Sequence, residues 1–351
     1  MTFEVVSIGA GAIANEHADR LAERDADIVA AADIDPDARE AFAAAYDCAG
    51  YEDYERMLEE TDPDVALVAV PNRLHAECAV AALERDINAF IEKPMARTLE
   101  GAERIVAAEE ASDAEAFVGF TMVFSPAFEA VAERVHDDEF GDVFEVDCTA
   151  VRRRGIPKLG GWFTQKAEAG GGALIDLGVH LLGVTVDLLE DPDVAAVSAR
   201  TGDHFGRDPE GYTYLDMWAG EPREDPTFDV DDSVRALVRF DDGTTLALDV
   251  TWASNREPER RVQVLGDEAG ATVPLDEGAP TVYGTDRDEL TDTELQIKEH
   301  DAWGAEWDYF FDVLAGEREH ATNTVQRGLT VQRIIDATYR SAESGGEVRL
   351  D

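Results

Sequence analysis

The sequence predicts an α/β protein of two domains, a doubly wound parallel sheet followed by an α+β domain with an open, mostly antiparallel sheet. Apolar strands alternate with amphipathic helices up to about residue 118, which is typical of a parallel sheet covered by helices. Beyond that point strands follow one another, and a DDG turn at 241–243 joins two of them. A length of 351 residues suits two hydrophobic cores. We therefore expect domains at 1–118 and 119–351, with the last helix, about 322–343, packing back on the first domain.

The chain is strongly acidic, with 30 Lys and Arg against 77 Asp and Glu and a formal net charge of −47. Such a surface repels nucleic-acid phosphates and anionic membranes, so we expect neither as a partner. Lysine occurs only at positions 93, 158, 166 and 298. Dispersed acids with few lysines suit a halophilic organism, in which salt screens the repulsion. An acidic protein from an ordinary organism is the alternative.

The cysteines and the N-terminus favour a reducing compartment. Cys48, Cys78 and Cys148 are far apart and form no CxxC pair, so we expect neither disulfides nor a metal site. The N-terminus enters a strand without a signal sequence, and we find no apolar run of about eighteen residues. These features predict a soluble, cytoplasmic protein.

The first apolar strand runs into a glycine turn, GAGAIA, that opens a helix. This is a GxGxxA dinucleotide-binding fingerprint: Gly9 permits the tight turn, Gly11 lets the backbone approach a pyrophosphate, and the small Ala14 lets helix and strand pack closely. Ala12 and Ile13 begin the helix, and we expect them to contact the cofactor together with the two glycines. A βαβ unit with an incidental glycine turn is the alternative.

The second strand, DIVAAAD, ends at Asp33, about twenty residues beyond the glycine turn. An acid at this place can hydrogen-bond both hydroxyls of an adenosine ribose and repels a 2′-phosphate, which favours NAD. Because Arg39 follows shortly downstream, NADP stays possible.

The strands DVALVAVPN and INAFIEKP carry polar residues at their carboxyl ends, where ligands of doubly wound sheets bind. Pro71 and Asn72 end the first strand, Glu92 and Lys93 end the second, and His75 stands in the first turn of the helix between them. All five are candidate cofactor contacts, and Lys93 is also a candidate substrate contact. An exposed loop lysine and a packing or capping histidine are the alternatives for Lys93 and His75.

The remaining elements follow in order. A helix near 99–111 and a strand at 116–120 complete the first domain. The expected elements of the second domain are a helix at 125–141, strands at 142–154, 194–202, 231–240, 244–252 and 260–266, and closing helices at 303–317 and 324–344.

The stretch GGGALIDLGVH, 170–180, predicts an apolar helix whose two polar side chains, Asp176 and His180, lie one turn apart on one face. Oxidation of an alcohol needs a proton acceptor near neutrality, which histidine provides, and a carboxylate can orient the imidazole. Lys93 can stabilise a developing alkoxide. The glycines would let the backbone approach cofactor or substrate. A buried, hydrogen-bonded Asp–His pair is the alternative.

In order and spacing, GAGAIA, VPNRLH, IEKP, GGGALIDLGVH and the ending YRSAESGGEVRL resemble the glucose–fructose oxidoreductase / inositol dehydrogenase (Gfo/Idh/MocA) family. The resemblance covers nearly the whole chain and implies an N-terminal Rossmann domain and an NAD(P)-dependent sugar or polyol dehydrogenase. It implies that Lys93, Asp176 and His180 meet at the nicotinamide, with His180 as the base. It also implies a homodimer or homotetramer formed through the open sheet of the second domain.

The segment AVRRRGIPKLGGWFTQKAEAGGG resembles the branch of glucoside 3-dehydrogenases and levoglucosan dehydrogenases, which implies oxidation of the C3 hydroxyl of a glucopyranose-like ring. Arg152 and Arg154 would face one side of a strand and Arg153 the other, so the three cannot line one pocket. Arginines that pair with surface acids, and a phosphate or carboxylate ligand, are the alternatives. The expected substrate contacts are Lys93, Arg153, Trp162, Lys166, Asp176 and His180.

Three functions fit this sequence. The first is an NAD-dependent sugar dehydrogenase, working in either direction. The second is a glycoside-cleaving enzyme that uses NAD transiently and therefore accumulates no NADH. The third is a non-catalytic NAD-binding regulator, which predicts a broken Lys–Asp–His set, whereas Lys93, Asp176 and His180 are all present.

Overall fold

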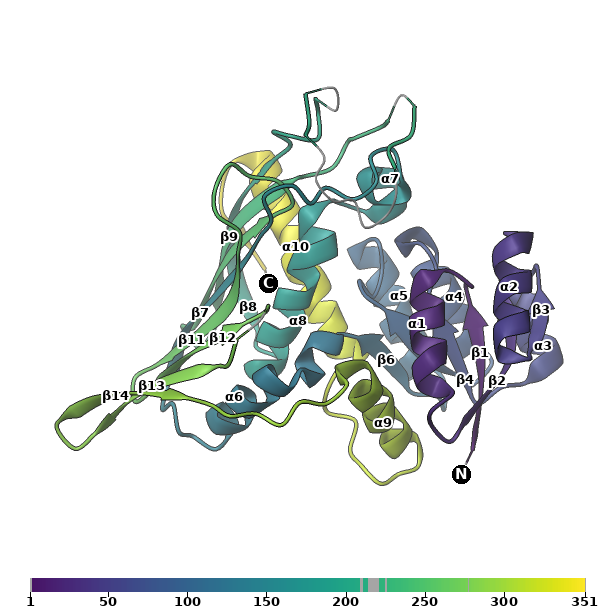
Figure 1. The fold of residues 1–351 in the computed structure, drawn as a ribbon, viewed down its shortest axis with the longest axis horizontal. Helices are drawn as coiled ribbons and strands as arrows, with labels where there is room; N and C mark the ends of the chain where they lie inside the picture. The colour runs from purple at the N-terminus through teal and green to yellow at the C-terminus, as the bar shows by residue number, and fades with distance from the viewer. Residues whose placement is uncertain (1, 209–210, 214–220, 225, 277, 351) are drawn as a thin grey trace. The chain divides into compact units, whose positions relative to one another are not determined.

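The computed structural model describes residues 2–208, 211–213, 221–224, 226–276 and 278–350, which form two compact units (Figure 1). The first unit comprises the chain up to Thr121 together with Asp301–Leu329. The second comprises Met122–His300 together with the chain from Thr330 onward. The sequence assigned residues 301–329 to the second domain, whereas the structure groups them with the first unit.

The first unit is built on a six-stranded parallel sheet in the order β3-β2-β1-β4-β5-β6. Its strands are β1 Phe3–Ile8, β2 Ala26–Ala32, β3 Ala49–Tyr51, β4 Val65–Val68, β5 Asn88–Glu92 and β6 Ala116–Gly119. Its helices are α1 Ala12–Leu21, α2 Pro36–Tyr46, α3 Tyr54–Thr61, α4 His75–Leu83, α5 Leu99–Glu110 and α9 Ala302–Leu314. The strand order reverses between β1 and β4, and ligands of such sheets bind beyond the strand ends at this point.

The side-chain pattern explains these elements. Every residue of β4 is apolar and buried, as a central strand covered on both faces requires. The side chains of Asp35, Asp53 and Thr98 accept backbone N–H bonds at the starts of α2, α3 and α5. Pro36 occupies the first turn of α2, where its missing N–H costs nothing.

Aromatic packing explains why α9 belongs to the first unit. Trp307 is fully buried and stacks on Phe90 of β5, with ring centroids 4.2 Å apart. Phe311 stacks on Phe3 of β1 at 4.8 Å. The segment that follows continues along β6, where the Val118 N–H donates to the carbonyl of Asn323 at 2.8 Å. The last helix, α10 Val325–Ser344, thus begins in the first unit.

The second unit is built on a nine-stranded, mostly antiparallel sheet in the order β14-β13-β12-β11-β7-β10-β9-β8-β15. Its strands are β7 Val143–Val151, β8 Val194–Gly202, β9 Ser233–Phe240, β10 Thr245–Thr251, β11 Glu259–Gly266, β12 Gly270–Pro274, β13 Thr281–Asp286, β14 Glu289–Glu294 and β15 Val348–Arg349. Its helices are α6 Pro126–His136, α7 Lys166–Ala169, α8 Val179–Leu188 and the greater part of α10. Both sheets confirm the predicted fold class.

Alternation along the strands gives this sheet two different faces. In β9 every second residue is buried, while Arg235 and Leu237 are exposed. Figure 1 shows α6, α8 and α10 along one face of the sheet. The opposite face is open to solvent in the part of the chain that the structure describes.

One helical stretch, Lys166–Leu188, corrects the expectation about apolar runs. By length and composition it could cross a membrane. In the structure, however, 89% of its apolar window is buried inside the protein, as in the core helix of a soluble protein. Its composition therefore reflects packing against the sheet.

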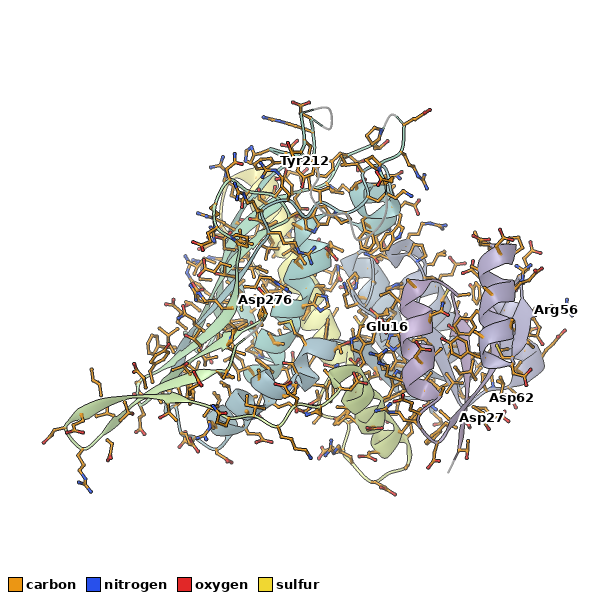
Figure 2. All side chains as sticks on the ribbon, viewed as in Figure 1. Glu16, Asp27, Arg56, Asp62, Tyr212 and Asp276 are labelled. Carbon is orange, nitrogen blue, oxygen red and sulfur yellow. The ribbon has the colours of Figure 1, made fainter. Side chains whose placement is uncertain are left out.

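Acidic side chains are dispersed over both units (Figure 2). Glu16, Asp27 and Asp62 are exposed on the first unit, and Asp276 is exposed on the second. The negative charge is therefore spread over the surface, as the sequence suggested, and is not collected in one segment.

Candidate active site

The glycine turn joins β1 to α1 and leaves space for a ligand. Gly9 has a φ of 107°, and a Cβ on it would lie 2.2 Å from the carbonyl oxygen of Ala69, so only glycine fits there. Gly11 is the N-cap of α1, and a Cβ on it would meet nothing within 4 Å. Ala14 is fully buried in a small-residue core with Ala18. A helix N-terminus that faces open space fits a pyrophosphate. Ala12 and Ile13 are exposed beside it.

Asp33 lies next to this turn, where an adenosine ribose would bind. One carboxylate oxygen accepts the backbone N–H of Ala10 and the other that of Asp35, both at 2.9 Å. Ile34, the next residue, is 80% exposed. Arg39 donates to the backbone carbonyl of Asp33 at 2.6 Å. These residues fit NAD, and the nearby guanidinium leaves NADP possible.

Of the predicted residues after β4, Asn72 and His75 are buried within the protein. Pro71 precedes a 3₁₀ turn, and Asn72 is only 4% exposed. The ring nitrogens of His75 lie 2.7 Å from the carbonyl oxygens of Pro94 and Val70. Burial lowers the pKa of His75 below its ordinary value. His75 therefore ties the end of β4 to the turn after β5, which agrees with the packing alternative.

Lys93 follows β5 and is half-buried, whereas Glu92 is 7% exposed. One carboxylate oxygen of Glu92 accepts the Lys93 backbone N–H at 3.0 Å, and the other lies 2.8 Å from Nε2 of His17. Burial raises the pKa of Glu92, but the hydrogen bond from His17 and neighbouring positive charges bring this pKa below its ordinary value. The Lys93 side chain is thus partly exposed, whereas the neighbouring Glu92 carboxylate is buried.

Asp176 and His180 lie in one continuous helical stretch. Asp176 belongs to a π-helical turn, Leu174–Gly178, that leads directly into α8. Such turns within helices are frequent at functional sites. Asp176 is 7% exposed and His180 is half-buried. The structure therefore places both predicted residues on the same segment of the second unit.

The glycines before this turn have a packing role. A Cβ on Gly172 would lie 1.9 Å from the carbonyl oxygen of Asp231, and one on Gly171 would lie 1.9 Å from the hydroxyl of Tyr339. The Asp231 carboxylate accepts the N–H groups of Gly172 and Leu174 at 2.8 and 3.0 Å, and Tyr339 donates to it at 2.7 Å. Close approach to Tyr339 and to Asp231 explains why glycine occurs at these two positions.

Trp252 and Arg152 lie beside the Asp176 carboxylate. The indole N–H of Trp252, which is fully buried, donates to Oδ2 of Asp176 at 2.8 Å. A guanidinium nitrogen of Arg152 lies 4.0 Å from the same oxygen. Burial lowers the pKa of Arg152 from its ordinary value. Asp176 thus has one neutral donor and one cation beside it.

The other predicted substrate residues of the second unit differ in exposure. Arg153 is exposed, and the arginine in contact with Asp176 is Arg152. Arg154 donates to the carbonyls of Arg153 and Ser254 at 2.6 and 2.7 Å. Trp162 is half-buried and stacks on the neighbouring Phe163, and Lys166 is exposed at the start of α7.

Sequence reasoning missed several residues that position the predicted ones. These are His17, Arg152, Asp231, Trp252 and Tyr339. Arg152 and Tyr339 lie in segments that the sequence analysis singled out, but all five contact residues far away in the chain, which a local motif does not encode. The signal for His17 was its place on the buried face of the amphipathic helix α1.

The family models agree with the fold. Residues 3–120 match an oxidoreductase family with an NAD-binding Rossmann fold, and residues 128–272 match the GFO/IDH/MocA C-terminal domain. A levoglucosan dehydrogenase solved with NADH and L-sorbose has a TM-score of 0.86 at 21% identity, over 100% of both chains, which shows a shared fold.

Two relatives extend the comparison. The D-glucoside 3-dehydrogenase of Escherichia coli (strain K12) is 30% identical over 99% of this chain and 97% of its own. The D-xylose 1-dehydrogenase [NADP(+)] of Haloarcula marismortui is 25% identical over 86% of this chain and 78% of its own. The chain belongs to the GFO/IDH/MocA family of NAD-binding oxidoreductases.

Proposed function

We propose that this enzyme oxidises the C3 hydroxyl of a glucopyranose-like sugar with NAD and that His180 is the base. Its relatives are sugar dehydrogenases, and the chain is an enzyme of the sugar and polyol dehydrogenase type. The observation that carries the finer proposal is the helical stretch that holds Asp176 and His180. Its buried carboxylate is hydrogen-bonded by Trp252, and the half-buried imidazole lies one turn further on.

The proposed chemistry assigns one task to each residue. His180 takes the hydroxyl proton, and Asp176 orients the imidazole and stabilises its charged form. Lys93 donates to the same oxygen and stabilises negative charge as the proton leaves. The nicotinamide, when bound, supplies the acceptor for the hydride from the carbinol carbon. The products are a ketone, a reduced cofactor and a proton. In this proposal Lys93 meets Asp176 and His180 at the nicotinamide.

Two half-buried side chains of the second unit, Arg152 and Trp162, suit a neutral, polyhydroxylated substrate. Arg152 is half-buried beside Asp176 and can donate to vicinal hydroxyls. Trp162 is half-buried and has an aromatic face that can stack on a sugar ring. We propose Arg152 as a substrate contact in place of Arg153, whose side chain is exposed.

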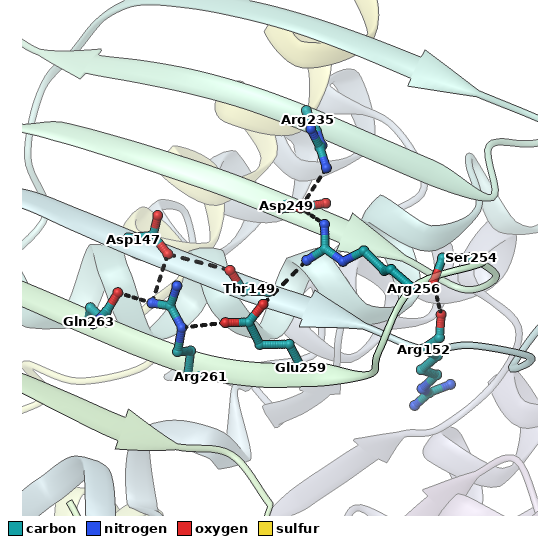
Figure 3. A network of polar contacts seen from close by, with 10 residues as sticks. All are labelled: Asp147, Thr149, Arg152, Arg235, Asp249, Ser254, Arg256, Glu259, Arg261 and Gln263. Atoms are coloured by element: carbon teal, nitrogen blue, oxygen red, sulfur yellow. Dashed lines mark hydrogen bonds and ion pairs between the residues drawn. The ribbon is translucent and has the colours of Figure 1, made fainter. Parts of the chain in front are cut away.

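The open sheet of the second unit is the proposed surface for a homodimer or homotetramer. Its outward face carries a network in which Asp249 pairs with Arg235 and Arg256, and Arg261 pairs with Asp147 (Figure 3). The lack of helices over this described face supports the proposal. The oligomeric mass of the purified protein in molar salt tests it.

NADH formation tests the proposed function. The protein would be mixed with NAD in molar salt and offered glucosides, levoglucosan, inositols, free aldoses and sugar phosphates. NADH with the glucosides or levoglucosan, and little with inositols, supports C3 oxidation of a pyranose. Glycoside cleavage without net NADH supports the glycoside-cleaving alternative. NAD binding with no turnover in either direction supports the regulator.

A further inference from the structure

One buried histidine has no part in the chemistry described so far. His17 lies in α1, the helix that begins at the glycine turn, and its side chain is 0% exposed. Phe90, Trp303 and Trp307 pack around its ring, edge to face, with centroids 4.8 to 5.7 Å apart. A polar ring so enclosed has to satisfy both nitrogens from the protein.

The hydrogen bonds fix the protonation of this ring. The indole N–H of Trp307 can only donate, and it lies 2.9 Å from Nδ1 of His17. Nδ1 is therefore an acceptor without a proton, so the proton of the neutral imidazole is on Nε2. Nε2 lies 2.8 Å from Oε1 of Glu92 and donates to it.

Glu92 connects His17 to Lys93 through hydrogen bonds. Its second oxygen, Oε2, accepts the backbone N–H of Lys93 at 3.0 Å. Both carboxylate oxygens are thus held, one by the helix that starts at the glycine turn and one by the peptide of Lys93. The carboxylate also lies close enough to the Lys93 ammonium for their charges to interact.

We propose that His17 is a positioning residue for Lys93. By donating to Glu92 it keeps a buried carboxylate charged and fixed, and this carboxylate in turn holds the Lys93 peptide in place. The dinucleotide helix and the lysine are thereby linked through three consecutive hydrogen bonds, Trp307–His17–Glu92–Lys93. The significance of the link for catalysis rests on the proposed role of Lys93.

The scarcity of lysine provides a direct test that needs no substrate. An amine-reactive reagent would be applied to the NAD-free protein, and mass spectrometry would follow labelling at Lys93, Lys158, Lys166 and Lys298, the only lysines of the chain. In His17→Phe the Glu92 carboxylate loses its donor and no longer fixes the Lys93 peptide. We expect Lys93 to become more mobile and to label about threefold faster or more, and the other three lysines to be unchanged.

Three further variants distinguish a positioning role of His17 from a general loss of stability. His17→Gln retains an N–H that can reach Glu92 and is expected to restore the wild-type labelling rate. Trp307→Phe removes the donor to Nδ1 together with part of a buried ring and is expected to shift Lys93 in the same direction by a smaller factor. Leu58→Ala empties a buried site in α3 of the same unit and should lower the melting temperature without a change at Lys93. Equal labelling of Lys93 in wild type and in folded His17→Phe overturns the proposal.

A double-mutant cycle tests the link to turnover. If His17 acts through Lys93, His17→Phe lowers kcat about tenfold in the wild type but not in Lys93→Met, while the Kd for NAD changes less than about threefold. Equal losses in both backgrounds overturn the positioning role. If no sugar is oxidised by the wild type, the proposed function fails, and the labelling result still decides whether His17 controls Lys93.

Discussion

At the scale of single residues, the orientation of Asp176 depends on the indole N–H of Trp252. Replacing this residue by phenylalanine keeps most of the buried ring but removes the indole N–H that donates to the buried carboxylate. A hydrogen bond to a charged group contributes about 1.5–3 kcal/mol. We expect Trp252→Phe to lower kcat roughly 10- to 100-fold, because in the proposed mechanism Asp176 orients His180, with little change in the Kd for NAD.

Steady-state kinetics with a sugar found in the substrate panel measure this effect. Tyr54→Phe serves as the control, since it removes the contact between the hydroxyl of Tyr54 in α3 and Glu77 in α4 of the first unit. A Trp252→Phe enzyme with wild-type kcat would show that the hydrogen bond to Asp176 has no catalytic role.

At the scale of elements, two glycines at helix starts separate a ligand site from a packing site. Gly11→Ala puts a methyl group into open space before α1, so stability should be unchanged while NAD binding weakens about tenfold or more. Gly172→Ala puts a methyl group against the Asp231 carbonyl, which should cost about 2–4 kcal/mol of unfolding free energy. Denaturant unfolding measures the stability of both variants, and NAD titration measures their affinity for the cofactor. The assignment of Gly11 to a ligand site and Gly172 to a packing site fails if Gly11→Ala destabilises the fold as much as Gly172→Ala does.

Helix α9 carries a carboxylic acid that should make stability depend on pH. Glu306 is fully buried, and burial raises its pKa well above the ordinary value of 4.5, with a further contribution from the charge of Glu92. Because the folded protein keeps this proton after the unfolded chain has lost it, stability is full below pH 4.5 and falls as pH rises toward the folded pKa.

Glu306→Gln should remove this loss of stability at higher pH, since an amide does not titrate and can still contact Thr121 and Asn323. We expect the variant to melt at the same temperature as the wild type in acid and at a higher temperature near neutral pH. Thermal unfolding across this pH range measures the difference. A variant that is less stable than the wild type at neutral pH would show that the carboxylate is needed in its charged form.

The same elements show how far sequence reasoning reaches. The sheet of the first unit, the glycine turn and the helical stretch with Asp176 and His180 follow from local pattern, because each is a run of neighbouring residues. Strands β13 and β14 were missed, since their residues are polar and largely exposed and carry no apolar alternation. The partners of α9 and the contacts of Trp252 and His17 depend on residues far away in the chain, which no local pattern encodes.

At the scale of the whole molecule, the charge of −47 should make the fold dependent on salt. The Debye length falls from about 10 Å at 0.1 M salt to about 3 Å at 1 M, so salt removes most of the repulsion between dispersed carboxylates. The ion pairs on the open sheet are weakened as well, but these exposed pairs contribute little. We therefore expect the free energy of unfolding and the activity to rise from low salt to molar salt.

Denaturant unfolding at increasing sodium chloride concentration measures this dependence. An uncharged osmolyte at equal osmolality is the control, because it stabilises folded proteins without screening charge. Equal stabilisation by osmolyte and by salt would show that electrostatic screening is not the cause of the higher free energy of unfolding. Maximal stability at low salt would contradict the halophilic origin inferred from composition.

The most direct test of the proposed chemistry is the amount of NADH formed for each sugar consumed, measured in molar salt for the wild type and for His180→Ala. We expect one NADH and one 3-keto sugar for each glucoside consumed by the wild type. We expect His180→Ala to bind NAD normally and to turn over about 10²- to 10⁴-fold more slowly, since the proton acceptor is gone. Sugar consumed without NADH, or a His180→Ala enzyme as fast as the wild type, would contradict a dehydrogenase that uses His180 as its base.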